Sequence, residues 1–264
     1  MSLARRHREK ILAAQHAAAV LDFVAAVPDA APLPASGTNL FTAADRAAAQ
    51  IALRLTHDLR RLKEIKSIDL KIAAKREMLP EYRDWIAGLI AADAGVGIGT
   101  AAEVLPTVMV WLIDTGSYAD ALDLVPFMFA HRVAMPSRYQ RDAATIVVEE
   151  IADAANKAQG AGASFPLDIL DRVADLTEAH DIHDEVRAKL FKAIGTEELT
   201  VAEDMEAGPA ARARLTVARN SLREAQRLHS RIGVSTKIKK AEKLIATNLT
   251  AFPPEDEQRG DDAA

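Results

Sequence analysis

Residues 51–72 of the chain read IALRLTHDLRRLKEIKSIDLKI, and the spacing of their aliphatic side chains decides the expected fold. The aliphatic positions recur every three or four residues, with an average spacing of about 3.5, the period of a coiled-coil seam. We therefore expect one long helix from Thr42 to Met78, where Leu79-Pro80 ends it, or the same segment folded as a helical hairpin. The seam comprises Ile51, Leu55, Leu59, Leu62, Ile65, Ile68 and Ile72.

The same segment is strongly basic, because residues 54–76 hold eight basic and three acidic side chains. On one continuous helix, five of these bases fall within about 60° of the side opposite the seam. Such a helix packs through one face and offers the other to phosphate groups. A solvated face on an antiparallel hairpin explains the spacing equally well. The five bases are Arg54, Arg60, Arg61, Lys71 and Lys75.

The composition favours helices and argues against several kinds of site. Alanine is abundant and aromatic residues make up only 5%, which predicts an all-α protein. The absence of cysteine excludes disulfides and thiolate metal sites. No apolar run approaches the ~20 residues that span a bilayer, so we expect no membrane partner. The sequence also lacks a Walker loop and a nucleophile elbow, and we predict no catalytic residue, no metal and no cofactor.

The pattern of breakers divides the chain into four predicted parts. Residues 1–40 form a basic helix and a Pro-rich linker, and residues 41–80 form the long basic helix. Residues 81–250 form a compact bundle of short helices, with pairs that resemble tetratricopeptide packing. Residues 251–264 form an acidic tail that we expect to be disordered. Within the bundle we expect helices at 82–94, 100–114, 117–133, 137–158, 166–179, 184–194, 209–232 and 236–249.

Charge is segregated along the chain, although the net charge is only −5. Residues 142–206 hold sixteen acids and five bases, whereas residues 212–243 hold ten bases and two acids. Blocks of opposite sign suggest subunits that meet head to tail, and solvated helix faces are the plainer alternative.

Two groups of side chains could support chemistry. His180 and His183, with acids beside them, have the residue types of a metal site, although an acid there caps a helix equally well. The second group is an acidic stripe on one helix, of the kind that holds divalent ions in nucleases, or a solvated face. The stripe consists of Asp168, Asp171, Asp175 and Glu178.

Four segments, in order, resemble the GpM-type terminase small subunits of Peduovirus-like temperate phages. They are KIAAKREMLP at 71–80 with Trp85 after it, TVMVWLIDTG at 107–116, Met135-Pro136, and DEVRAKLFKAIG at 184–195. The resemblance spans roughly residues 45–245. It departs at residues 1–40, which have no counterpart, and at 253–262, which are acidic where the family has a basic tail. DNA binding would then fall to residues 54–76, to 212–243, or to Arg5, Arg6, Arg8 and Lys10.

The resemblance implies a subunit that binds double-stranded phage DNA at the packaging site in the cytoplasm of the infected bacterial host. It further implies a homo-oligomeric ring that hands DNA to a large subunit with ATPase and nuclease activity. The family is often labelled an endonuclease subunit. A metal-dependent nuclease acting through His180 and His183, or a helical-repeat adaptor that binds only protein, are the alternatives. The predicted DNA-binding residues are Arg54, Arg60, Arg61, Lys63, Lys71, Lys75 and Arg76.

Overall fold

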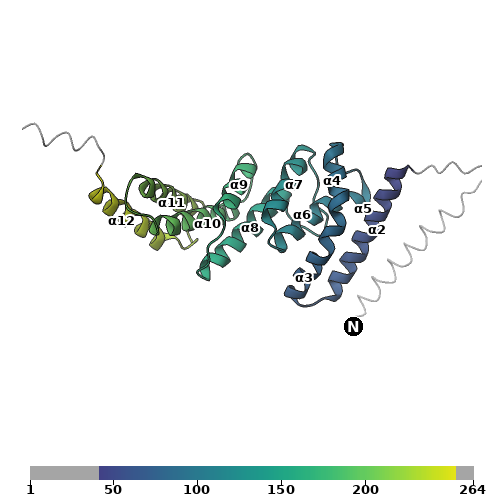
Figure 1. Cartoon of the computed structure of the whole chain (residues 1–264), viewed down its shortest axis with the longest axis horizontal. Coiled ribbons are helices and arrows are strands. Elements are labelled where there is room, and N and C mark those ends of the chain that lie inside the picture. The colour runs from purple at the N-terminus through teal and green to yellow at the C-terminus, as the bar shows by residue number, and fades with distance from the viewer. Residues whose placement is uncertain (1–41, 254–264) are drawn as a thin grey trace, which may run out of the picture. The chain divides into compact units, whose positions relative to one another are not determined.

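The computed structural model describes residues 42–253, and within that range every regular element is a helix. This confirms the predicted all-α class. None of the described helices is long and apolar enough to cross a membrane. The elements in Figure 1 are α2 (Ala43–Glu64), α3 (Ile68–Met78), η1 (Leu79–Tyr82), α4 (Arg83–Ala92), α5 (Gly99–Ala102), α6 (Val104–Asp114), α7 (Tyr118–Ala130), α8 (Ala143–Gly160), α9 (Leu167–Thr177), α10 (Asp184–Glu203), α11 (Pro209–Leu228) and α12 (Ser235–Ala251).

The chain divides into two units, Met1–Ala43 and Ala44–Ala264, and the described helices belong to the second from Ala44 onward. Several predictions fall outside the described residues. These are the N-terminal helix with its basic residues, the linker at 28–37, and positions 254–264 of the acidic tail. The four-part division of the chain stays a prediction.

The predicted single helix through Met78 is wrong, because the chain leaves the helix between α2 and α3. Ser67 is extended there, and its hydroxyl accepts a hydrogen bond from the Leu70 amide at 3.4 Å. A serine in this position satisfies an amide that the first turn of α3 would otherwise leave unpaired, so a new helix begins. The segment therefore forms the hairpin that the same spacing allowed. Arg61 on α2 reaches Glu77 on α3 at 2.7 Å.

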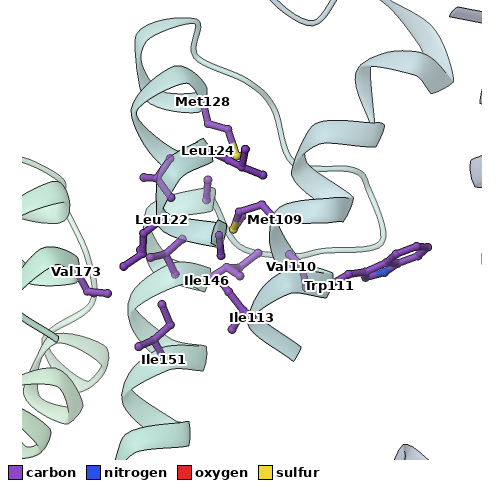
Figure 2. Close-up of a cluster of buried hydrophobic side chains, with 14 of the residues drawn as sticks. Met109, Val110, Trp111, Ile113, Leu122, Leu124, Met128, Ile146, Ile151 and Val173 are labelled. Carbon is purple, nitrogen blue, oxygen red and sulfur yellow. The ribbon is translucent and has the colours of Figure 1, made fainter. Parts of the chain in front are cut away.

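Helix α6 lies in the middle of the main core, because nearly all its side chains are apolar and buried. Trp111 points away from the rest of that cluster, and its ring meets the ring of Tyr82 edge-on at 5.9 Å. The core thus joins the hairpin on one side of α6 to α7, α8 and α9 on the other. Figure 2 labels Met109, Val110 and Ile113 from α6, Leu122, Leu124 and Met128 from α7, Ile146 and Ile151 from α8, and Val173 from α9.

The predicted helix end at Gly195 is also wrong, since α10 continues through it to Glu203. Gly195 is a position of close helix packing. A Cβ atom there would lie 2.7 Å from Leu222 Cγ and 2.9 Å from the Ala218 carbonyl oxygen of α11. Only glycine permits that approach. The first half of α10 packs in the main core, and its second half packs with α11 and α12 in a second cluster. Figure 1 shows α11 alongside α10.

Two predicted helices differ from the observed ones. The helix expected from Ser137 begins only after Asp142, whose side chain accepts from the Thr145 amide at 2.9 Å. The single helix expected over 100–114 is divided at Glu103 into α5 and α6, and the Glu103 carboxylate accepts a hydrogen bond from Arg138 at 2.7 Å. The tetratricopeptide-like pairing stays a prediction.

Candidate nucleic-acid interface

A buried hydrogen bond fixes α2 against η1 behind the turn of the hairpin. The Tyr82 hydroxyl donates to Asp58 Oδ2 at 2.7 Å, and both residues are buried. Burial and the neighbouring carboxylate raise the pKa of Tyr82 above its usual value, so the hydroxyl keeps its proton and remains a donor. Because the ring also packs on Trp111, this bond ties the hairpin to the main core.

Two of the predicted DNA-binding arginines are engaged in ion pairs within the hairpin. Arg61 donates to Glu77 at 2.7 Å, and Arg54 lies 3.1 Å from Glu81. These partners are 16 and 27 residues apart along the chain, so only the fold-back of α3 brings them together. All four side chains are well exposed, and the pairs contribute little to stability. They do neutralise the two arginines locally.

Two further predicted residues bind the end of α6. Lys75 forms an ion pair with Asp114, and its side chain is only 16% exposed. Arg76 donates to the Thr115 carbonyl oxygen at 3.1 Å. Cations at the last turn of a helix bind its free carbonyl groups and its negative dipole end. These two bases therefore hold α3 against α6.

The side chains of the remaining predicted residues, Arg60, Lys63 and Lys71, make no hydrogen bond or ion pair within the described range. Lys66, in the turn itself, shares this property. All four lie in the last turns of α2, in the turn, or in the first turn of α3. Two acids accompany them there, Glu64 and Asp69. The bases without a side-chain partner in this segment therefore lie at one end of the hairpin, which we call the basic apex: Arg60, Lys63, Lys66 and Lys71.

A second basic surface lies on α11 and α12. Several of its bases are paired, as Arg214 is with Glu198 at 2.9 Å and Arg223 with Glu242 at 2.6 Å. Six bases in this part of the structure have no acidic partner among the described residues, and two of them, Arg212 and Lys237, bind polar groups of other side chains. The other four are Arg219, which binds only its neighbour Asn220, and Arg231, Lys239 and Lys243, whose side chains have no described partner. These four provide a matched comparison for the basic apex.

The acidic stripe lies along α9, a helix that packs against α10. Burial, followed by the negative charge of Glu198, raises the pKa of Asp171 above its ordinary value. Burial and the nearby Asp114 likewise raise the pKa of Glu150. Both acids also have positive neighbours that oppose these shifts, Arg214 near Asp171 and Lys189 with Arg141 near Glu150.

The candidate metal site does not assemble in the part of the chain that the structure describes, where no three His, Asp or Glu side chains lie close enough to hold an ion. His180 instead stacks on Phe129, with the ring centroids 4.0 Å apart. Its carbonyl oxygen accepts from Arg187 at 2.9 Å. His183 precedes the first residue of α10 and is exposed. Both histidines therefore have roles in the α9–α10 connection.

A family model described as the phage small terminase subunit matches residues 52–185, about half of the chain. The chain belongs to that family. The match begins within α2 and ends at the start of α10, so it contains the hairpin and the whole main core as far as α9. The basic apex thus lies within the family region, whereas α11 and α12 lie beyond it.

One curated relative of this terminase subunit is the "Terminase, endonuclease subunit" of Escherichia phage P2. It is 38% identical over 146 residues, which cover 55% of this chain and 58% of the relative. The alignment therefore spans less than two thirds of that relative's length. No solved structure matches the chain.

The sequence did not distinguish structural bases from free ones in this family region. By charge alone, Arg61 and Lys71 are equivalent. The helix break at Ser67 makes them different, because it lets Arg61 pair with Glu77 and leaves the Lys71 side chain unpaired. The one available signal was the serine itself, followed by Asp69, which together are typical of a helix start. The predicted site also left out Lys66, which the structure places in the turn between α2 and α3.

Proposed function

We propose that this terminase small subunit is the DNA-recognition subunit of a phage packaging complex. It binds double-stranded phage DNA at the packaging site, in the cytoplasm of the infected bacterial host, and presents it to a large ATPase and nuclease subunit. The observation that supports this best is the basic apex. Four uncommitted cations gather at one end of a clamped hairpin, inside the region that matches the family.

The basic apex binds DNA through its phosphates. Cations that have no protein partner give up only water and counterions when they contact DNA, whereas Arg61 and Lys75 must first leave their carboxylates. Each neutralised phosphate releases condensed counterions, which makes the affinity strongly dependent on salt. The contacts position the subunit on the duplex and carry no base specificity of their own.

We assign the cutting step to the large subunit. The name of the P2 relative refers to an endonuclease, and a nuclease acting through His180 and His183 is the competing proposal. The positions of these histidines favour the first assignment, because one stacks on Phe129 and the other precedes α10 at the surface. The acids nearby also have partners, since Glu149 and Asp153 both bind Lys189.

We further propose that the subunit works as a homo-oligomeric ring. The acidic face of α9 and the basic surface of α11 and α12 have opposite charges, and a head-to-tail contact between copies would pair them. Such a heterologous contact forms a closed ring when the rotation that relates one copy to the next is a whole fraction of 360°. Native mass measurement in low salt, with and without a duplex, tests this proposal. A single-chain mass in both conditions would contradict it.

Binding of a fluorescent duplex to matched variants tests the recognition proposal. One variant replaces Arg60, Lys63, Lys66 and Lys71 by glutamine, and the control replaces Arg219, Arg231, Lys239 and Lys243. The first should lose at least tenfold in affinity at low salt, while the second should bind as the parent does. An equal loss in the control would place recognition on α11 and α12 instead. If the parent protein shows no salt-sensitive binding to DNA, the result would favour the alternative in which the subunit is an adaptor that binds only protein.

The same preparation tests the nuclease alternative. The purified subunit should leave plasmid DNA intact in Mg²⁺ or Mn²⁺ and should support cutting only together with the large subunit. Cutting by the subunit alone that His183→Ala abolishes would overturn the assignment.

A further inference from the structure

Two lysines on the outer face of α12 have no partner among the described residues. Lys239 and Lys243 are both exposed and lie one helical turn apart. Ala241, halfway between them, is fully buried in the cluster that α10, α11 and α12 share. Side chains two positions to either side of a helix residue lie about 160° from it, so both lysines point away from that cluster. Like charges at this spacing repel each other, which favours an anion beside them.

The acids on α12 and at the end of α10 are bound to other bases. Glu242 is the one acid in α12, and Arg223 of α11 binds it at 2.6 Å. Glu203, the last residue of α10, forms an ion pair with Lys240. The outer face of α12 therefore keeps an excess of positive charge within the part of the chain that the structure describes.

A third lysine of α12 reports the same positive surroundings. The Lys237 ammonium group donates to the Thr196 hydroxyl at 2.9 Å, and the side chain is half-buried. Burial, followed by the positive charges of Lys192 and Lys240, lowers the pKa of Lys237. Cations near the start of a helix also oppose its dipole, and the first turn of α12 has no acid. An anionic partner would relieve both effects.

The chain itself supplies acids directly after α12. Residues 255–262 read EDEQRGDD, with five acids and one base, and they lie outside the described range. Just before them, Arg212 of α11 binds the Asn248 side chain at 3.1 Å and also the Phe252 carbonyl oxygen. This anchor fixes the point from which the acidic segment continues, at the C-terminal end of α12.

The possible reach of the acidic segment covers both lysines. Lys243 and Lys239 precede Ala251, the last residue of α12, by about 12 and 18 Å along the helix. The nine residues after Pro253, as far as Asp262, span up to about 30 Å when extended. A covalent link of this length also keeps the acids near the helix at an effective concentration on the order of millimolar.

We propose that the acidic segment 255–262 binds Lys239 and Lys243 on the outer face of α12 through ion pairs with their ammonium groups. One consequence, which rests on the proposed DNA-binding function, is that duplex phosphates do not reach these two bases. Recognition is then confined to the basic apex, which has no such acidic segment beside it in the sequence. Because salt screens exposed ion pairs, the contact is strongest at low ionic strength.

The α9 face of a neighbouring copy is the other acidic surface that these lysines could meet. That face must arrive by association between copies, whereas the acidic segment is joined to α12 in every copy. The segment therefore occupies the lysines in the free subunit. Formation of the proposed ring contact would displace it, because both need the same bases.

A double-mutant cycle in the 264-residue chain tests the contact. One change neutralises the acidic segment by replacing its three Asp with Asn and its two Glu with Gln, and the other replaces Lys239 and Lys243 by Gln. The neutral-segment variant should bind a duplex with a salt slope steeper by about 2, since two lysines become available at about 0.9 per contact. In the Lys239→Gln/Lys243→Gln background, the same neutralisation should leave the slope unchanged.

Acetylation of lysines gives a second readout that does not need DNA. In the free protein, Lys239 and Lys243 should react about twofold faster or more once the segment is neutral, because a nearby carboxylate favours the charged, unreactive ammonium form. Lys71 in the basic apex is the internal control, and its rate should be the same in both proteins. Mass spectrometry of the labelled chains measures all three rates.

The outcomes separate the contact from the proposed function. Equal steepening of the salt slope in both lysine backgrounds would show that the segment acts through net charge alone, and would overturn the contact. Unchanged labelling and an unchanged slope would also overturn it and leave recognition by the apex standing. Faster labelling in a protein that does not bind DNA would support the contact and overturn the recognition function. Unchanged labelling with a larger native mass would assign the lysines to a contact between copies and overturn the proposal.

Discussion

Tyr82 on η1 donates its hydroxyl to Asp58 on α2 at 2.7 Å, in a position where both residues are buried. This hydrogen bond joins α2 to η1, the element that follows the hairpin. It joins the region that we propose binds DNA to the core that supports it. A buried carboxylate that loses its donor keeps the penalty of desolvation, so the pair is sensitive to substitution.

Tyr82→Phe should therefore lower the free energy of unfolding by about 1–3 kcal/mol. The ring and its contact with Trp111 remain, so the loss reports the hydroxyl alone. Urea denaturation followed by circular dichroism measures it. Tyr118→Phe is the control, because the Tyr118 hydroxyl makes no hydrogen bond within the described range, and it should change stability by less than about 0.5 kcal/mol. Equal effects of the two substitutions would contradict the structural role of the Asp58 bond.

Substitutions of Lys75 and Lys71 should affect different properties, stability for Lys75 and DNA binding for Lys71, although both residues lie on α3. Lys75→Gln removes the partner of Asp114 and should lower the free energy of unfolding by about 1–2 kcal/mol, with little change in DNA affinity. Lys71→Gln should leave stability within about 0.5 kcal/mol and weaken binding. Thermal melts and duplex titrations of both variants are the measurement. The reverse pattern would show that the helix face predicted from sequence, and not the apex, meets DNA.

The sequence was sufficient for the fold class, the buried face of α2 and most helix positions, because these depend on local periodicity. The predicted seam is wrong at Ile68, which is 74% exposed. It failed where tertiary contacts decide. Gly195 has the appearance of a helix terminator, but α11 approaches it so closely that α10 must pass through with no side chain there. The helix expected over 100–114 divides at Glu103, whose carboxylate binds Arg138, a residue 35 positions later. For the same reason the sequence could not distinguish Arg54, Arg61 and Lys75 from the unpaired bases, since the acids that bind these three residues are distant along the chain.

Gly195→Ala tests the close packing of α10 on α11. The added Cβ would force Leu222 or the backbone at Ala218 to shift, which should cost about 1–3 kcal/mol. Gly88→Ala on α4 is the control, because nothing lies within 4 Å of a Cβ there. Alanine reduces the conformational entropy of the unfolded chain relative to glycine, so that variant should be more stable by about 0.5–1 kcal/mol. Denaturant midpoints of the two variants should therefore move in opposite directions, and a neutral Gly195→Ala would contradict the helix crossing.

The α9 stripe predicts a pH-dependent effect. Because the pKa of Asp171 is raised by burial and by Glu198, its ionised form is less favourable in the folded chain than in the unfolded one. Ionisation therefore removes stability as pH rises from the ordinary carboxyl pKa of 3.8 through the raised value. Asp171→Asn should raise the melting temperature at neutral pH by no more than about 2 °C, since the group is largely exposed. The gain should vanish near pH 3, where the carboxyl is protonated in both states, and a gain that persists there would contradict the electrostatic cause.

The salt dependence of duplex binding tests the central claim, that the basic apex is the DNA-contacting surface, most directly. The slope of log affinity against log salt counts the phosphates that protein cations neutralise, at about 0.9 per contact on double-stranded DNA. Replacing Arg60, Lys63, Lys66 and Lys71 by glutamine should reduce the magnitude of that slope by about 3–4, while the matched replacement of Arg219, Arg231, Lys239 and Lys243 should leave it unchanged. An unchanged slope in the apex variant, with the loss appearing in the α11–α12 variant, would contradict the claim.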